Sequence, residues 1–170
     1  GYGWEKLFSE RMCRHFTEDF GLETRVARFH NIYGPEGTFD GGREKAPAAM
    51  CRKVIEAKLN NKNVIDVWGD GTQTRSFLYI DDCIDAILKL FHSNYSYPIN
   101  LGNPEEITIK NLAHKISLNL NKKPNLQYLK MPEDDPVQRK PCIETAIKEL
   151  KWKPKICLNK GLVKTIDYFF

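Results

Sequence analysis

The segment Gly1-Tyr-Gly-Trp-Glu-Lys6 is the starting point for interpreting the rest of the chain. Tyr2 and Lys6 are four residues apart at the start of a helical pattern, so they lie on one face of a helix. There the ammonium group can stabilise a phenolate, which makes the tyrosine usable as a general base near neutral pH. An ordinary surface helix with an exposed Tyr and Lys would produce the same short pattern. The spacing alone therefore leaves both interpretations open.

A second set of sequence blocks favours the catalytic interpretation. The block Arg28-Phe-His-Asn-Ile-Tyr-Gly-Pro35 indicates a strand that ends in a turn, and Gly41-Gly-Arg-Glu-Lys-Ala-Pro47 leads into a helix. Further on, Arg75-Ser-Phe77 follows a Gly-Asp-Gly turn. In this order the blocks resemble the extended short-chain dehydrogenase/reductases that act on nucleotide sugars, the NAD-dependent epimerase/dehydratase family. Within that family they look most like the GDP-mannose 3,5-epimerases, and the resemblance runs from Gly1 to about Lys110.

The composition is that of an ordinary soluble globular protein. The 170 residues suit one domain, and 41% of them are hydrophobic and 28% charged. The net charge of +4 is spread along the chain, which does not indicate nucleic-acid binding but suits an anionic small substrate. The sequence has no run of about 18 apolar residues, so we expect no membrane span. The five cysteines form no Cys-x-x-Cys or Cys/His cluster, so we expect reduced thiols in a cytoplasmic protein and no metal site.

The sequence lacks the glycine-rich turn that holds the pyrophosphate of a dinucleotide. No Gly-x-Gly-x-x-Gly or Gly-x-x-Gly-x-x-Gly follows a predicted strand. We therefore expect an α/β fold, namely the C-terminal half of a Rossmann-type NAD(P)-binding fold plus a small α/β substrate-binding domain. Residues 1–35 would be the second part of the Rossmann domain, and 36–170 mainly the substrate-binding domain, with about 75–93 returning to the Rossmann domain. The N-terminal dinucleotide-binding half would be absent, so this chain alone would neither bind NAD tightly nor turn over.

Apolar periodicity predicts the order of the helices and strands. The predicted helices cover 1–20, 45–57, 81–92, 109–119, 144–150 and 158–170, and the predicted strands cover 24–33, 64–68, 72–80, 97–102 and 126–129. In the first helix the residues Trp4, Phe8, Met12 and Phe16 form one apolar stripe. The stripe suits core packing, and the resemblance adds a four-helix dimer interface. In the 81–92 helix the apolar positions are Ile84, Leu88 and Phe91.

Lys45 is the candidate acid/base residue of the second stretch. It lies just before a helix N-terminus, where the helix dipole disfavours an ammonium ion, and partial burial would act in the same direction. Both effects favour the neutral amine that proton transfer requires. The alternative is a solvated surface lysine. The UDP-glucuronate decarboxylases of the same family lack this lysine.

Several other residues are candidate substrate ligands. Asn31 ends a strand, so it could hydrogen-bond a sugar at the carboxyl edge of the sheet or cap its own turn. Arg75 could hold a diphosphate through its planar guanidinium group or pair with a carboxylate as a structural residue. The resemblance places further substrate contacts at Glu44, Lys45, Ala46, Lys53, Gln73, Thr74 and Arg139.

One segment departs from the 3,5-epimerase pattern. Pro132-Glu-Asp-Asp-Pro-Val-Gln-Arg-Lys-Pro141 looks more like the UDP-glucuronate decarboxylases and their dehydratase relatives, in which an arginine at the position of Arg139 binds the nucleotide diphosphate. The alternatives are therefore a UDP-glucuronate decarboxylase, a 4,6-dehydratase or a 4-epimerase of the same fold. A sugar-nucleotide-binding module or an inactive fragment, without catalysis, is a further alternative that the absent glycine motif supports.

The resemblance also implies a mechanism. C4 of the hexose is oxidised by NAD⁺ while Tyr2 takes the C4 hydroxyl proton, and Lys6 supports Tyr2 and hydrogen-bonds the nicotinamide ribose. The C4 ketone acidifies the hydrogens at C3 and C5, and Lys45 is one member of the acid/base pair that exchanges them. In the family the other member is a cysteine upstream of the catalytic tyrosine. The resemblance further implies GDP-mannose as the favoured substrate and a homodimer.

Overall fold

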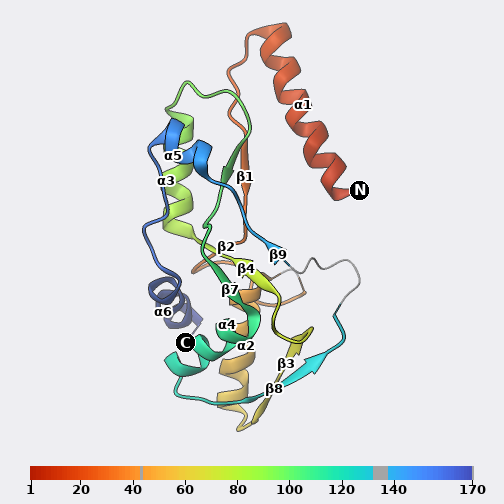
Figure 1. The fold of residues 1–170 in the computed structure, drawn as a ribbon, viewed down its shortest axis with the longest axis vertical. Helices are drawn as coiled ribbons and strands as arrows, with labels where there is room; N and C mark the ends of the chain where they lie inside the picture. The colour runs from red at the N-terminus through yellow and green to blue at the C-terminus, as the bar shows by residue number, and fades with distance from the viewer. Residues whose placement is uncertain (43, 132–137, 170) are drawn as a thin grey trace.

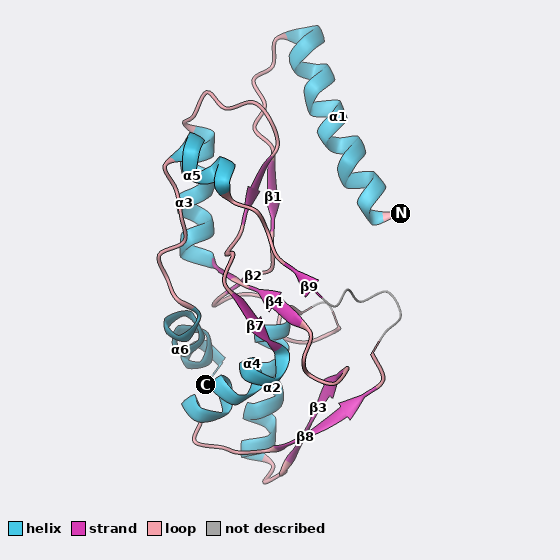
Figure 2. Ribbon diagram, viewed as in Figure 1, coloured by secondary structure: helices cyan, strands magenta, loops and turns pink. Residues whose placement is uncertain are grey.

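Helices alternate with short, mostly parallel strands through residues 1–42, 44–131 and 138–169, which are the residues that the computed structural model describes (Figures 1 and 2). In chain order the elements are α1 (Tyr2–Phe20), β1 (Ala27–Phe29), β2 (Ile32–Tyr33), α2 (Ala46–Leu59), β3 (Val64–Trp68), β4 (Thr74–Ser76), β5 (Leu78–Tyr79), α3 (Ile80–Phe91), β6 (Ile99–Leu101), β7 (Glu106–Thr108), α4 (Ile109–Asn119), β8 (Asn125–Leu129), β9 (Gln138–Arg139), α5 (Glu144–Leu150) and α6 (Leu158–Phe169).

The helices predicted from periodicity are confirmed. The predicted bounds of α4 agree with the structure at both ends. At its N-terminus Thr108 caps the helix, because its side chain accepts a hydrogen bond from the backbone N–H of Asn111 at 3.1 Å. At the end of α1, Gly21 adopts a left-handed conformation with φ of 68°, and its N–H bonds back into the last turn. No helix in the described part of the chain is long and apolar enough to cross a membrane.

Two strands predicted as continuous are each broken into two. The segment 24–33 forms β1 and β2, because Asn31 takes a left-handed φ of 44° between them. The break lets the chain change partners, since β1 pairs in parallel with β6 and β2 pairs in parallel with β5. The segment 72–80 is divided into β4, which pairs with β7 and β9, and β5, which pairs with β2. Two local predictions of long strands were therefore wrong for a non-local reason.

Strand β4 is the centre of the sheet that carries the candidate substrate residues. It lies between β7, which is antiparallel, and β9, which is parallel. It does not pair with β3 across the turn at Gly69–Gly71, because β3 pairs in parallel with β8. In that turn the carboxylate of Asp70 accepts hydrogen bonds from the backbone N–H and the hydroxyl of Thr72, at 2.9 and 2.6 Å.

The buried apolar side chains form two clusters. The larger one joins α2, α4 and α6 with β3, and Val54, Leu112 and Leu162 lie at its centre. The smaller one joins α3, β6 and α5 around Trp152, whose side chain is 1% exposed. These clusters hold the frame on which the candidate site residues sit. The domain boundaries expected from the sequence remain a prediction.

Two apolar helix faces are largely exposed in the described part of the chain. Helix α1 buries none of its residues, and Trp4 and Phe8 of the predicted stripe are 76% and 64% exposed. Core packing within this chain is therefore the wrong interpretation of that stripe. Helix α3 buries Cys83, Ala86 and Leu90 on one face. The apolar positions predicted from its sequence, Ile84, Leu88 and Phe91, are exposed. Figure 1 shows α1 standing at one end of the molecule, opposite α2.

Candidate functional site

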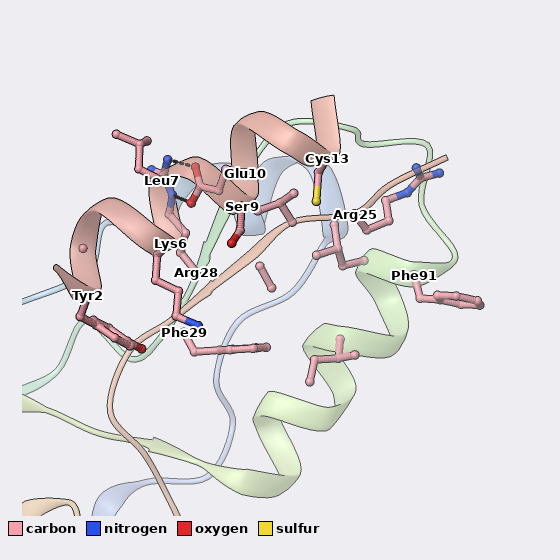
Figure 3. Close-up of a pocket in the computed structure, with 15 residues that line it drawn as sticks. Tyr2, Lys6, Leu7, Ser9, Glu10, Cys13, Arg25, Arg28, Phe29 and Phe91 are labelled. Atoms are coloured by element: carbon pink, nitrogen blue, oxygen red, sulfur yellow. Dashed lines mark hydrogen bonds and ion pairs between the residues drawn. The ribbon is translucent and has the colours of Figure 1, made fainter. Parts of the chain in front are cut away.

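Tyr2 and Lys6 share one cavity, as their spacing predicts. The cavity has a volume of about 870 Å³ and is walled by the inner face of α1, by residues 25–29 and by the C-terminal half of α3. The Nζ atom of Lys6 lies 5.2 Å from the centroid of the Tyr2 ring, which is a cation–π geometry. Figure 3 shows both side chains extending from α1 toward Phe29. The structure thus brings the phenol and the ammonium group together, and their catalytic role remains a prediction.

An ion pair holds α1 against β1 beside this cavity. The guanidinium group of Arg28 donates from Nε to Oε1 of Glu10 at 2.7 Å and from a terminal nitrogen to Oε2 at 2.6 Å (Figure 3). This two-pronged contact holds the pKa of the Glu10 carboxyl below its usual value, mainly through the hydrogen bond. Because α1 buries no side chain, the pair is a main determinant of where Tyr2 and Lys6 lie.

We therefore expect Glu10→Gln to loosen α1. The folded-state pKa of Glu10 is depressed, so its stabilisation is present above the ordinary carboxyl pKa of about 4.3 and is lost as pH falls through the depressed value. The effect on docking should be at most about 1 kcal/mol, because the pair is partly exposed. Hydrogen–deuterium exchange of residues 2–20 measures it. The matched control is Glu18→Gln, which breaks the Arg14–Glu18 pair within the same helix and should not release α1. Equal exchange in both variants would contradict the prediction.

Arg75 and Arg139 occupy facing positions of adjacent strands. In the parallel pairing of β4 with β9, Arg75 is the register partner of Arg139. Side chains at facing positions of neighbouring strands point to the same face of the sheet. Arg75 is 8% exposed and donates to the carbonyl of Thr74 at 2.7 Å, whereas Arg139 is exposed. Two arginines at facing strand positions are an arrangement that can bind an anion such as a diphosphate.

Three other candidate residues make hydrogen bonds within the fold around β4. The side-chain amide of Asn31 donates to the carbonyl of Ser76 at 3.1 Å. It therefore links the break between β1 and β2 to the end of β4 instead of capping its own turn. Gln73 is 4% exposed, and its amide donates to the carbonyl of Trp68. The hydroxyl of Thr74 donates to Oε1 of Glu106 at 2.8 Å, beside a second cavity of about 640 Å³. Whether these residues also contact a substrate remains a prediction.

Lys45 is the N-cap residue of α2, the position expected from the sequence. Its backbone carbonyl accepts the first hydrogen bond of the helix, from Ala49 at 3.0 Å, and Ala46 follows as the first helical residue. Its side chain is exposed, so the partial burial expected from the sequence is not found. Among the described residues its amine has no hydrogen-bond or ion-pair partner. Lys53, in contrast, donates to the carbonyl of Asp66 in β3 at 2.8 Å.

The candidate residues fall into two groups. Tyr2 and Lys6 line the cavity beside α1, and none of the candidate substrate residues lines it. Lys45 precedes α2, and Arg75 and Arg139 lie in β4 and β9, away from the body of α1 (Figure 1). The end of α1 that bears Tyr2 is the end nearer to this second group. Most of the Pro132–Pro141 segment lies outside the described residues, as does Arg43.

Sequence reasoning missed several residues near the two groups. His30 lies half-buried next to Asn31, and burial lowers its pKa below the usual value, with the positive charge of Arg139 acting in the same direction. Arg28 and Glu10 are eighteen positions apart, and Arg52 contacts Phe39 over thirteen. No local pattern signals contacts of this kind.

Cys51 and Cys83 are poor candidates for the second acid/base residue. Both thiols are buried, and burial raises the pKa of Cys51 to about 12 and that of Cys83 to about 11. They therefore remain protonated near neutral pH. Cys142 and Cys157 are exposed, and Cys13 borders the cavity beside α1.

Comparison with known proteins identifies the family. A model of the NAD dependent epimerase/dehydratase family matches residues 1–102. The chain belongs to this family. It is 42% identical over 170 residues to GDP-mannose 3,5-epimerase of Arabidopsis thaliana, covering 99% of this chain and 43% of that protein. It is 36% identical over 168 residues to UDP-glucuronic acid decarboxylase 1 of Danio rerio, covering 99% of this chain and 38% of that protein.

Solved structures confirm the fold class predicted from the sequence. This chain matches the crystal structure of UDP-glucose 4-epimerase from Thermotoga maritima with UDP-glucose, with a TM-score of 0.89 at 26% sequence identity. The match covers 99% of this chain and 52% of that chain. The chain thus spans about half the length, or less, of the relatives it matches. Its α/β architecture is accordingly part of a Rossmann-type epimerase fold.

Proposed function

We propose that this chain supplies the Tyr2–Lys6 pair and the sugar-nucleotide-binding residues of a GDP-mannose 3,5-epimerase. The observation that carries the proposal is Lys45, an exposed amine at the start of α2 with no partner among the described residues. A 3,5-epimerase needs a base at the two carbons that flank a C4 ketone, whereas the other family reactions do not. The 42% identity to the Arabidopsis thaliana enzyme supports the same assignment.

A nicotinamide cofactor fits the residues that are present on the α1 side. Tyr2 and Lys6 offer a hydroxyl and an ammonium group to one open cavity of about 870 Å³, which suits a ribose and a reacting sugar. When bound, NAD supplies the hydride acceptor and donor for C4. The rest of its site would come from additional polypeptide corresponding to the N-terminal half of the relatives, which this chain does not span.

The chain's own residues then have distinct tasks. Tyr2 takes and returns the proton of the C4 hydroxyl, with Lys6 stabilising the phenolate. Arg75 and Arg139 hold the diphosphate and so orient the hexose. Lys45 moves protons at C3 and C5, and its acid/base partner lies outside this chain. The exposed apolar face of α1 would pack in a homodimer of the complete, cytoplasmic enzyme.

The second candidate is a UDP-sugar enzyme of the same family, either a decarboxylase, a 4,6-dehydratase or a 4-epimerase. Two observations favour it: the 36% identity to a UDP-glucuronic acid decarboxylase and the Pro132–Pro141 sequence block, which resembles that group. A binding module without catalysis is the remaining alternative.

Proton NMR in D₂O on the full-length polypeptide that contains this chain, with NAD⁺ and GDP-mannose, separates these possibilities. The proposal predicts deuterium at both C3 and C5 of the recovered sugar. Turnover of a UDP-sugar without such exchange would establish the second candidate and refute the first. Absence of any turnover across both substrate classes would favour the binding module.

A further inference from the structure

We infer that Arg52 is a positioning residue that fixes the segment carrying Lys45, an inference that rests on the proposed function. Arg52 lies in α2, seven positions after Lys45, and the resemblance assigns it no role. Its guanidinium group contacts three separate points of the chain: the Phe39 carbonyl, the Glu44 carboxylate and the Glu56 carboxylate. Two of these points belong to the segment that leads into Lys45.

All three nitrogens of the planar Arg52 guanidinium group make contacts. Its Nε donates to the carbonyl oxygen of Phe39 at 2.8 Å, and one terminal nitrogen donates to Oε1 of Glu44 at 3.0 Å. The other terminal nitrogen lies 3.3 Å from Oε1 of Glu56, one turn further along the same helix. The Glu56 contact thus lies within α2, whereas the other two donors reach the segment. A lysine has one nitrogen and cannot span these three acceptors.

Such an anchor acts on the described residues that lead into Lys45, namely Glu36–Gly42 and Glu44, with Arg43 lying outside the described residues. Gly41 and Gly42 both have φ of 79°, a left-handed conformation that glycine adopts readily and that does not by itself fix the backbone. The segment has a second anchor at Phe39, whose ring centroid lies 4.9 Å from that of Phe169 in α6. Among the described residues the Lys45 amine has no hydrogen-bond or ion-pair partner, so its position depends on its neighbours in sequence.

Glu44 links the anchor directly to Lys45. Its side chain is only 8% exposed, and Oε2 is buried without a partner among the described residues. The pKa of Glu44 lies below its usual value, chiefly because its own backbone N–H bonds the carboxylate and also because Arg52 does. The carboxylate is therefore ionised at neutral pH, and its pairing with Arg52 persists there. Removing Arg52 would leave this buried charge uncompensated, and the adjacent Lys45 would shift with it.

The first test measures the segment itself, without reference to activity. Hydrogen–deuterium exchange of residues 37–45 in this chain should become about tenfold faster in Arg52→Gln and also faster in Arg52→Lys, as expected for the loss of hydrogen bonds to charged groups. The matched control is Glu56→Gln, which removes only the contact within α2 and should leave exchange close to that of the wild type. Unchanged exchange in Arg52→Gln would overturn the inference.

The second test measures chemistry in the full-length polypeptide. Arg52→Gln should slow deuterium wash-in at C3 and C5 by about 10- to 100-fold, the usual cost of a misplaced catalytic group, while oxidation at C4 proceeds. Arg52→Lys should recover part of the loss, and Glu56→Gln should behave as wild type. If Lys45→Ala abolishes wash-in and Arg52→Gln leaves it intact, the inference is wrong and the proposed function stands. If Lys45→Ala leaves wash-in intact, the role proposed for Lys45 fails, and the inference fails with it.

Discussion

If the proposed function is right, replacing Tyr2 by phenylalanine should lower the turnover of the full-length polypeptide by about 10² to 10⁴-fold, the usual contribution of a general acid/base. The substitution removes only the hydroxyl, so the ring remains beside Lys6, whose Nζ lies 5.2 Å from the ring centroid. In the proposed mechanism the phenolate takes the C4 hydroxyl proton, and Tyr2 is the only tyrosine among the described residues that line the cavity. Reduction of NAD⁺ in a single turnover, followed at the absorbance of NADH, measures this step directly.

A matched tyrosine separates this effect from a general one. Tyr97 is 68% exposed, comparable to Tyr2 at 74%, and lies outside the cavity beside α1. Tyr97→Phe should therefore retain turnover within about twofold, as expected for a surface position away from the chemistry. Turnover of Tyr2→Phe within the same range would show that the Tyr-x-x-x-Lys spacing is that of an ordinary surface helix. Circular dichroism of both variants checks that α1 and the rest of the chain are folded.

The helices could be predicted because their signals are local. Apolar periodicity and the N-cap at Thr108 lie within a few residues of the structure they specify, and the predicted bounds of α4 agree with the structure. The strand partners could not be predicted, because each depends on residues far along the chain. Asn31 shows this best: its turn-like sequence is visible, but its left-handed backbone divides one expected strand into β1 and β2, and its amide bonds to Ser76, forty-five positions away.

In the candidate site, too, the features with local sequence signals could be predicted, and those that depend on distant residues could not. The position of Lys45 before α2 follows from the neighbouring proline and the helical pattern. Its exposure does not, because burial depends on what else packs there. The apolar stripe of α1 was likewise visible from its spacing, but the sequence does not specify which molecule covers it. The contacts that position the site, such as Arg28 with Glu10, join residues with no common pattern.

Replacing Asp82 by alanine should lower the free energy of unfolding by about 2 to 5 kcal/mol, because it leaves two backbone donors without their acceptor. Asp82 is 4% exposed, and its Oδ2 accepts the backbone N–H groups of Lys155 at 3.0 Å and Ile156 at 2.8 Å. These contacts tie α3 to the segment between α5 and α6. Because Ile156 packs on the larger apolar cluster and Cys83, next to Asp82, belongs to the smaller one, the carboxylate helps to hold the two clusters together. Urea denaturation followed by circular dichroism measures the change.

The neighbouring residue Asp81 provides the control for this prediction. Both aspartates lie in the first turn of α3, so both lose the same favourable interaction with the helix dipole when replaced by alanine. The Asp81 side chain is 54% exposed, and its only described partner is Lys164 at 3.4 Å, so Asp81→Ala should cost no more than about 0.5 to 1 kcal/mol. The difference between the two variants isolates the hydrogen bonds to Lys155 and Ile156. Equal losses in both would mean that the helix dipole, and not the buried carboxylate, explains the stability that Asp82 provides. Asp82→Asn, which retains an acceptor oxygen, should fall between the two alanine variants, since a neutral amide oxygen accepts the same N–H groups more weakly than a carboxylate does.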